Sequence, residues 1–295
     1  MIAAISNEYI TAKINTLGAE LVSLTGHDEV EYLWTGNPDF WNGQAPILFP
    51  TVGRLKDKKA VIGGAEYAMG VHGFARKSEF TLISNTRDEA VFSLKSGEET
   101  KKMYPYDFEL LVTYALNGLT LETRMEVTNL SNADMLYGIG GHPGFNVPLY
   151  SGEVFEDYQL VFGKKETIDA PAFTAEEEID FGSRTRVMTG SNILPLSYDL
   201  FASDAIILDK PASTEVAVVH KTGGHGVKME FSDFPCIAFW TKKDAPYVCL
   251  EPWHGIGVCT GETADFAAKR MIIRQEAGVS RSFSYFVTVL KGNDI

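Results

Sequence analysis

The feature that most constrains this sequence is a pair of alternating segments joined by Asn117-Gly118. The segment 108–116 has apolar side chains at every second position, and the segment 119–127 repeats that spacing after the dipeptide. Because successive side chains of a strand point to opposite faces, a period of two indicates strands with one buried face. Asn-Gly favours a tight hairpin, since both residues of a type I′ turn need positive φ. The sequence therefore predicts an antiparallel hairpin with a two-residue turn at Asn117-Gly118.

The same period of two recurs along the whole chain, for example at 10–14, 92–95 and 283–289. Helix signals are few, and the stretch 97–105 predicts only a turn or two of helix before Pro105. Many short strands with little helix indicate an all-β chain built as a large antiparallel β-sandwich or barrel. The sequence has no Pro/Ser-rich linker, charge block or fixed-period repeat, so we expect a single domain over residues 1–295.

Charge and composition exclude several classes of partner. The formal net charge of −13 argues against binding to nucleic-acid phosphates or to an anionic membrane surface. No stretch approaches the roughly 20 apolar residues of a membrane span, and the N-terminus lacks the pattern of an export signal. The three cysteines have no Cys-x-x-Cys spacing, which favours free thiols in a reducing compartment. We therefore expect a cytoplasmic protein. The oligomeric state is left open.

The carboxylate of Glu251 stands in an unusual context. It follows the apolar run 247–250 directly and precedes Pro252, which we expect to end the strand because proline cannot donate to a sheet ladder. A buried carboxylate without a partner is costly. Glu251 is therefore expected to have a partner, to reach water or to take part in chemistry.

Two of the six histidines, His72 and His142, follow glycine-punctuated turns that can bring an imidazole and the backbone close to a ligand. His27 is expected in a solvated loop, and His220 and His225 are expected to flank a turn between strands. His254 lies three residues after Glu251 and could support it. Among these groups, one carboxylate and two histidines form a set suited to general acid–base catalysis.

Other chemistries are less well supported. There is no His-Glu-x-x-His, no Gly-x-Ser-x-Gly, no Walker loop and no dinucleotide fingerprint. Two separated histidines and one glutamate could still converge on zinc. The expectation is that neither a cofactor nor a metal is needed.

Six segments, in order along the chain, resemble those of the aldose 1-epimerase (galactose mutarotase-like) family, most closely its LacX-like branch. They are NPDFWNGQAPILFPTVGRLKD (37–57), GVHGFARKSEF (70–80), YPYDFELLVTYAL (104–116), GIGGHPGFNVPL (138–149), FASDAIILDK (201–210) and YVCLEPWHG (247–255). The resemblance implies a supersandwich of antiparallel sheets with a small-molecule sugar site on a concave face.

The resemblance also implies roles for particular residues. Glu251 matches the catalytic base, His142 the general acid and His72 a second active-site histidine. Arg54 matches an arginine that contacts sugar hydroxyls, and Asp204 matches a sugar-binding aspartate, with Asp209 as the alternative. In the implied reaction, Glu251 deprotonates the C1 hydroxyl while His142 protonates the ring oxygen. The open aldehyde then rotates and recloses as the other anomer.

One departure from the galactose enzymes leaves the substrate open. The reading from His72 to Arg76 is HGFAR, which looks more like the LacX and hexose-6-phosphate branches. Arg54, Arg76 and Lys77 could hold a phosphate, although Arg76-Lys77 could equally be a solvated strand edge. We expect neutral aldohexoses to be accepted, with at most a modest gain from a 6-phosphate. The alternatives are a hexose-6-phosphate mutarotase, a non-catalytic carbohydrate-binding or sensing protein, and a glycosidase with paired carboxylates.

Overall fold

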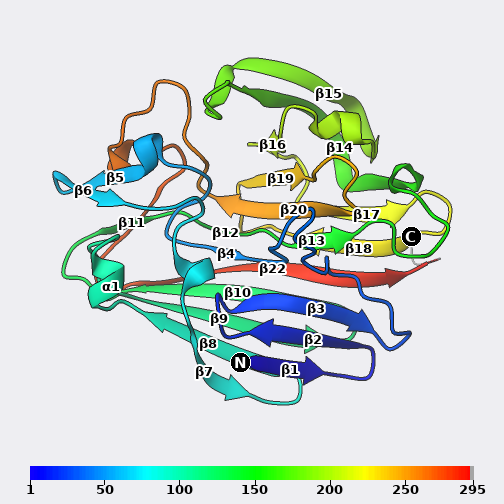
Figure 1. Ribbon diagram of the computed structural model, residues 1–295, viewed down its shortest axis with the longest axis horizontal. Helices are drawn as coiled ribbons and strands as arrows, with labels where there is room; N and C mark the ends of the chain where they lie inside the picture. Colours follow the sequence, from blue (N-terminus) through cyan, green and yellow to red (C-terminus); the bar gives the residue numbers. More distant parts are fainter. Residues whose placement is uncertain (293–295) are drawn as a thin grey trace.

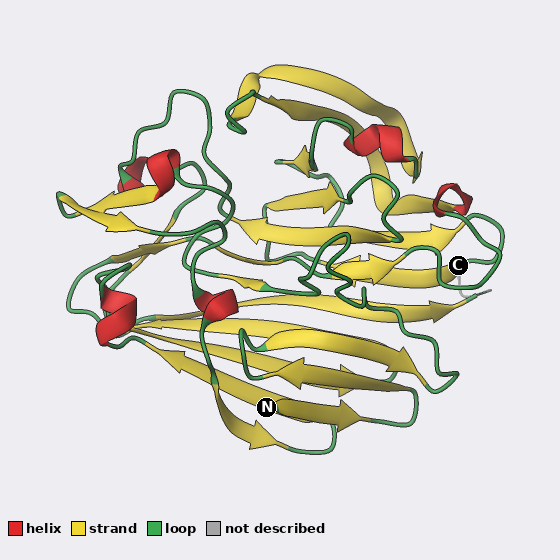
Figure 2. Cartoon of the chain, viewed as in Figure 1, coloured by secondary structure: helices red, strands yellow, loops and turns green. Residues whose placement is uncertain are grey.

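A computed structural model describes residues 1–292, and strands dominate it (Figures 1 and 2). Its largest sheet is antiparallel and has nine strands in the order β15-β14-β17-β18-β22-β10-β9-β8-β7. These strands are β7 (Thr81–Asn85), β8 (Glu89–Lys95), β9 (Phe108–Asn117), β10 (Thr120–Asn129), β14 (Tyr158–Phe173), β15 (Ile179–Pro195), β17 (Glu215–His220), β18 (His225–Glu230) and β22 (Ser280–Lys291).

A second antiparallel sheet has six strands. Its order is β16-β19-β20-β12-β4, with β13 also paired to β20. Its strands are β4 (Ile47–Leu48), β12 (Ile139–Gly141), β13 (Gly144–Asn146), β16 (Ile206–Leu208), β19 (Cys236–Trp240) and β20 (Tyr247–His254).

Smaller elements complete the fold. The remaining strands are β1 (Ile2–Ser6), β2 (Ile10–Asn15) and β3 (Glu20–Gly26) in one sheet, β5 (Lys59–Ile62) with β6 (Ala65–Ala68), and β11 (Met135–Tyr137) with β21 (Ile273–Gln275). The helical segments are α1 (Glu98–Lys101) and the 3₁₀ turns η1 (Lys56–Lys58), η2 (Ala75–Lys77), η3 (Phe155–Asp157), η4 (Tyr198–Phe201) and η5 (Phe266–Ala268). Within residues 1–292, no helix has the length and apolar character needed to cross a membrane.

The predicted hairpin is present, but its turn lies one residue further along. Asn117 pairs with Thr120, so the loop is Gly118-Leu119 and not Asn117-Gly118. Gly118 has a φ of 58°, whereas Asn117 and Leu119 keep negative φ. This pattern matches a type II′ turn, in which glycine takes the first loop position. The alternation survives, because Leu116 and Leu121 face each other and both are buried.

The sheets share one hydrophobic core, which makes the fold a β-sandwich as the alternation predicted. Buried side chains of β9, β10 and β22 in the nine-stranded sheet belong to the same cluster as those of β12, β19 and β20 in the six-stranded sheet. The buried face of β2 joins this cluster as well. The nine-stranded sheet therefore forms one layer, and the six-stranded and three-stranded sheets lie against it (Figure 1).

The expectation that Pro252 ends its strand is wrong, because β20 continues to His254. The neighbouring strand is interrupted between β12 and β13, where His142 and Pro143 lie. The Leu250 amide donates to the Pro143 carbonyl across this interruption, at 3.0 Å. The nitrogen of Pro252, two residues further along β20, points to the same side of the strand as the Leu250 amide. Proline is tolerated in a central strand here because the partner ladder is locally absent.

Candidate active site

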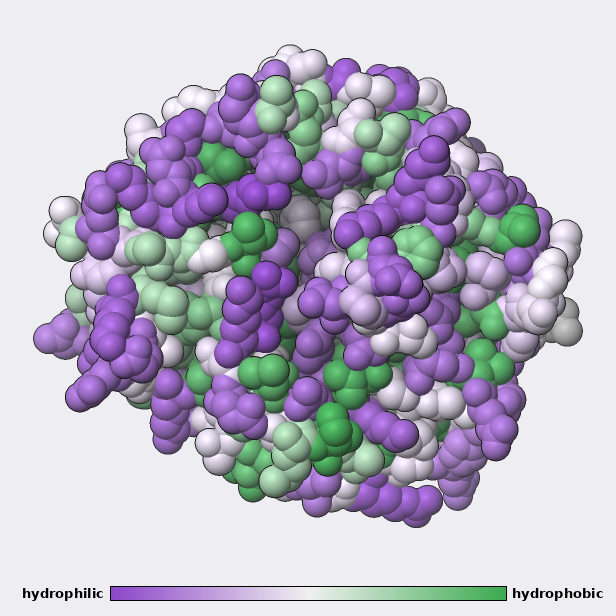
Figure 3. Space-filling view, in the orientation of Figure 1, coloured by the Kyte–Doolittle hydropathy of each residue, from purple (hydrophilic) through white to green (hydrophobic). Residues whose placement is uncertain are grey.

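All six residues predicted for the site line one pocket of about 260 Å³. They are Arg54, His72, Arg76, His142, Asp204 and Glu251. The space-filling view shows a recess near the centre of this face, in the region where β19 and β20 lie in Figure 1 (Figure 3). Asp209, the alternative to Asp204, does not line the pocket. It is bound instead by the guanidinium of Arg184, at 3.1 Å.

The position of Glu251 follows from the alternation of β20. Glu251 pairs with Ala238 of β19, and its side chain is only 1% exposed. Trp253, two residues on, lines the same pocket because it shares the face of the strand. His254 takes the opposite face, and its Nδ1 lies 3.3 Å from the Met271 carbonyl. It therefore does not support Glu251 as the sequence suggested.

His142 lies in the short connection between β12 and β13, and its main chain is fixed there. Its amide donates to the Pro46 carbonyl at 3.2 Å. The preceding Gly140 has no room for a side chain, since a Cβ atom would lie 2.6 Å from the Pro252 carbonyl oxygen. The glycine-rich sequence thus lets this connection run close against β20, which brings His142 beside Glu251.

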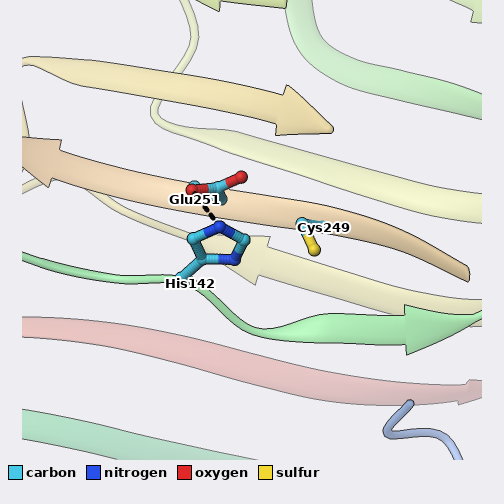
Figure 4. A group of neighbouring side chains, drawn as sticks. All are labelled: His142, Cys249 and Glu251. Carbon is cyan, nitrogen blue, oxygen red and sulfur yellow. Dashed lines mark ion pairs between the residues drawn. The ribbon is translucent and has the colours of Figure 1, made fainter. Parts of the chain in front are cut away.

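The imidazole of His142 and the carboxylate of Glu251 touch. His142 Nε2 lies 3.2 Å from Glu251 Oε2, as Figure 4 shows. Neither His142 Nδ1 nor Glu251 Oε2 has a well-aligned hydrogen bond within the described chain, although both atoms are buried. Buried polar groups are normally satisfied. This pair therefore keeps unused hydrogen-bonding capacity at the pocket wall.

Burial shifts the pKa values of these two groups in opposite directions. It raises the pKa of Glu251 well above the usual range, and the nearby charge of Asp204 adds to this effect, while Trp253 acts in the other direction. Burial lowers the pKa of His142 to about 3, with a smaller opposing contribution from its own backbone carbonyl. Both shifts favour the uncharged forms, a protonated carboxyl group on Glu251 and a neutral imidazole on His142.

Aromatic rings enclose His142. Trp41 lies against the imidazole with ring centroids 4.8 Å apart and an interplanar angle of 31°, and Trp240 meets it edge-on at 5.7 Å. Both tryptophans line the pocket. Apolar ring faces are suited to the C–H faces of a sugar, and they also attract an imidazolium. Trp41 lies within the segment 37–57 that carries the family resemblance, but the sequence predicted no role for it.

His72 is held in a strained but well-fixed loop. It has a φ of 63°, in the left-handed region, and Gly73 follows with a φ of 72°. A Cβ at Gly73 would come within 2.2 Å of the Phe49 carbonyl oxygen, so only glycine fits there. The Gly53 amide donates to His72 Nδ1 at 3.1 Å. Nδ1 therefore accepts, and the proton of the neutral ring is on Nε2, where it can be donated.

His72 also lies against His142. Its ring lies 5.4 Å from that of His142, edge to face. Burial lowers the pKa of His72 well below the usual value, helped by the positive electrostatic influence of His142 and Arg76. A neutral imidazole that donates from Nε2 is suited to bind a hydroxyl or a developing negative charge.

The two predicted arginines have different surroundings. Arg54 is half exposed and forms an ion pair with Glu177 at 2.6 Å. Arg76 is partly buried, its Nε has no hydrogen-bond partner among the described residues, and burial lowers its pKa, against a smaller effect of Glu20. Lys77 is exposed and is not part of the pocket lining. Of the suggested phosphate-binding trio, only Arg76 is therefore uncommitted and within the pocket.

One group of donor atoms at the wall of the pocket and just behind it has the spacing of a metal site. Atoms of His142, Cys249 and Glu251 lie within 4.8 Å of one another, whereas His72 is not in this group (Figure 4). A cysteine binds metal as the thiolate. Burial and the charge of Glu251 raise the pKa of Cys249 well above its usual value, which disfavours that form.

The remaining histidines lie outside the pocket. His27 is exposed, as expected. His220 and His225 flank the turn between β17 and β18, also as expected, and there they stack on each other beside Glu153. Glu177 is another pocket residue for which the sequence predicted no role. Its only signal was a run of three glutamates, which normally indicates a solvated surface.

Comparison with known proteins links this geometry to one family. The family model described as "Aldose 1-epimerase" matches residues 1–263. Protein LacX (plasmid) of Lactococcus lactis subsp. lactis is 38% identical over 298 residues, covering 98% of this chain and 100% of that protein. A putative glucose-6-phosphate 1-epimerase of Escherichia coli (strain K12) is 33% identical over 132 residues, 41% of this chain and 42% of that protein.

A solved structure agrees over the full length. The galactose mutarotase related enzyme from Lactobacillus acidophilus superposes with a TM-score of 0.94 at 33% sequence identity, covering 100% of this chain and 99% of that chain. The likeness extends to the whole arrangement of sheets and is not confined to a few motifs.

Proposed function

Because the chain belongs to the aldose 1-epimerase family and is therefore an isomerase, we propose that it interconverts the α and β anomers of a neutral aldohexose. The observation that carries the proposal is the contact of His142 Nε2 with Glu251 Oε2, 3.2 Å apart, at the wall of a pocket of sugar size. Ring opening of a hemiacetal needs a base at the C1 hydroxyl and an acid at the ring oxygen at the same time. The pair supplies both.

The number of protons that Glu251 and His142 hold together fits this reaction. In the form with Glu251 protonated and His142 neutral, the pair holds one proton. Transfer of that proton across the contact gives a carboxylate and an imidazolium with the same count. This ionic form opens the ring: Glu251 takes the proton of the C1 hydroxyl, His142 gives its proton to the ring oxygen, and the C1–O5 bond breaks.

Ring opening leaves Glu251 protonated and His142 neutral. This is also the form that recloses the sugar, since Glu251 then returns a proton to the aldehyde oxygen while His142 takes one from the O5 hydroxyl. Rotation about C1–C2 between the two steps gives the other anomer. Each step begins and ends with one proton on the pair, so the cycle requires neither a cofactor nor a net exchange with water.

The other pocket residues bind the sugar in this proposal. His72 donates from Nε2 to a sugar oxygen, while Arg54, Asp204 and Arg76 bind hydroxyl groups. Trp41 and Trp240 face the apolar side of the ring, and their quadrupoles help to stabilise the imidazolium form of His142 against burial. The three buried free thiols support the further proposal that the protein works in a reducing compartment such as the cytoplasm.

The test is a panel of pure anomers. Freshly dissolved α-glucose, α-galactose and their 6-phosphates are followed by polarimetry or NMR with and without the protein. We expect faster equilibration of the neutral sugars, with at most a modest further gain for the 6-phosphates. A large preference for a 6-phosphate that is lost in Arg76→Ala would favour the hexose-6-phosphate enzyme. Binding without any acceleration would favour a carbohydrate-binding protein.

A further inference from the structure

We propose that Glu177 is a specificity-determining residue that selects uncharged aldoses against sugars carrying an anionic group. The inference rests on the proposed function, because it names the substrate class of the same pocket. It follows from the position of this side chain, from its contact with Arg54 and from the other charges of the pocket.

Glu177 lies at the tip between β14 and β15, in a tightly bonded turn. The Thr174 amide donates to the Glu178 carbonyl at 2.9 Å, and the Glu177 amide donates to the Thr174 carbonyl at 3.0 Å. Glu177 has a φ of 61°, a conformation that turns the chain back towards the body of the protein. Its side chain lines the pocket together with Phe173 and Ile179, which flank the tip. The hairpin tip is therefore a wall of the site.

The carboxylate of Glu177 forms an ion pair with the guanidinium of Arg54. Its Oε2 lies 2.6 Å from Arg54 Nη2, and both side chains are about half exposed. Asp204 is a second carboxylate at this end, with a pKa that burial raises, that Glu177 raises further and that Arg54 lowers. One guanidinium thus stands among two carboxylates, so its charge is already offset before a ligand arrives.

Arg76 brings a second positive charge to the pocket. It influences His142 and His72 electrostatically, and none of the described carboxylates is within ion-pair distance of it, although the charge of Glu20 acts on it. The two guanidinium groups of the pocket therefore differ: Arg54 is paired with Glu177 and lies near Asp204, whereas Arg76 has no ion-pair partner among the described residues. Sugar hydroxyls can donate to the carboxylates and accept from the guanidinium, whereas a phosphate is repelled by Glu177.

The chain contains matched controls within the same tip. Glu176 is exposed and does not line the pocket, and Glu178 forms an ion pair with Lys56. Glu176→Gln and Glu177→Gln make the same change in net charge one residue apart. Glu177→Asp keeps the charge at the pocket wall. These three variants separate a local effect from a change in overall charge.

The experiment measures dissociation constants for an aldohexose and for its 6-phosphate, by fluorescence of the pocket tryptophans. In Glu177→Gln, binding of the 6-phosphate should tighten about ten-fold relative to the neutral sugar, the size expected for removing one like charge at ~6 Å in a medium of effective dielectric constant about 40. Glu176→Gln and Glu177→Asp should leave the ratio unchanged. In the parent protein the preference should weaken with added salt, because Glu177 is half exposed.

An unchanged ratio in Glu177→Gln would overturn the inference, and so would an equal shift in Glu176→Gln. Equal tightening of both sugars would also overturn it, since Glu177 would then merely compete for Arg54. The binding ratio does not depend on turnover. Failure of anomer interconversion with the expected shift in the ratio would therefore reject the proposed function and keep the inference, and the reverse pattern would do the opposite.

Discussion

Two clusters in this molecule pair histidine with glutamate at hydrogen-bonding distance, and they differ in how their remaining atoms are used. His225 Nε2 lies 2.9 Å from Glu153 Oε1, much as His142 lies beside Glu251. Glu153 also accepts from the Tyr158 hydroxyl, and that hydroxyl accepts from the Leu149 amide at 2.9 Å. In the Glu251 cluster, by contrast, His142 Nδ1 and Glu251 Oε2 are buried and make no well-aligned hydrogen bond with the described residues.

The pKa shifts of the two glutamates express this contrast. Burial acts to raise the pKa of Glu153, but hydrogen bonds from Tyr158 and His225 outweigh it, so the pKa falls. Glu251 has no such set of donors, and its pKa rises well above the usual range. The same two residue types thus make a fully hydrogen-bonded cluster in one place and a pair with unused hydrogen-bonding capacity in the other. The difference lies in the hydrogen bonds left unmade beside a cavity.

The sharpest way to break this comparison is to neutralise each glutamate in turn. Glu251→Gln keeps size and polarity but cannot take a proton, so kcat should fall by roughly 10²-fold or more, with little change in sugar binding. Glu153→Gln should leave kcat within about two-fold, because Glu153 is not in the pocket lining. Saturation-transfer NMR of equilibrated anomers measures both. A comparable loss of activity in the two variants would remove the distinction.

The free energy of unfolding should change in opposite directions in Glu251→Gln and Glu153→Gln. Glu251 has a raised pKa in the folded protein, so the stability from its bound proton is present below the unfolded pKa of about 4.3 and is lost as pH rises through the folded value. Glutamine does not titrate and has no such loss. The free energy of unfolding of Glu251→Gln should therefore exceed that of the parent protein by about 1 kcal/mol at pH 8, or roughly 2 °C in Tm, with little difference at pH 4.

Glu153 has a lowered pKa, so its contribution is present above the unfolded pKa and is lost as pH falls through the folded value. Glu153→Gln should accordingly lose about 1 kcal/mol at pH 8, because hydrogen bonds to a charged acceptor are replaced by weaker ones. Thermal unfolding of parent and variants at both pH values provides the measurement. A higher Tm in Glu153→Gln than in the parent protein would show that the carboxylate of Glu153, like that of Glu251, destabilises the fold at pH 8.

The smallest expected effect is the absence of a titration. A second proton on the pair of His142 and Glu251 would go to His142, whose pKa is lowered to about 3, because the pKa of Glu251 is raised well above the usual range. On acidification from about pH 7 to about pH 5.5, kcat/KM should therefore show no fall near pH 6.5, where exposed histidines titrate. A ten-fold decrease across that interval would mean that His142 titrates like a solvated residue.

Much of the fold could be predicted from local patterns. The alternation at 108–127 and 283–289 predicted strands with one buried face, and these segments are buried as expected. The turn was misplaced by one residue because glycine suits a type II′ turn as well as a type I′ turn. Pro252 was misjudged because its tolerance depends on a gap in the neighbouring strand, which is a tertiary feature. The single-domain organisation stays a prediction, and a single cooperative unfolding transition would support it.

The candidate site, too, could be predicted only in part from the sequence. Glu251, His142 and His72 were found through family resemblance, and the structure brings them to one pocket. The ion pair of Arg54 with Glu177 had no sequence signal, because these residues are far apart and a run of glutamates suggests solvent. The contrast between Glu251 and Glu153 was equally hidden, since it depends on which donors surround each carboxylate.

The most direct test of the central claim is a double-mutant cycle on Glu251 and His142. The variants Glu251→Gln, His142→Gln and the double variant are compared with the parent protein by saturation-transfer NMR. If the two groups exchange protons with one bond as a unit, each single change removes most of the catalysis, and the double change costs much less than the product of the two. Independent, multiplicative losses, or a near-normal kcat in Glu251→Gln, would contradict the paired acid–base mechanism.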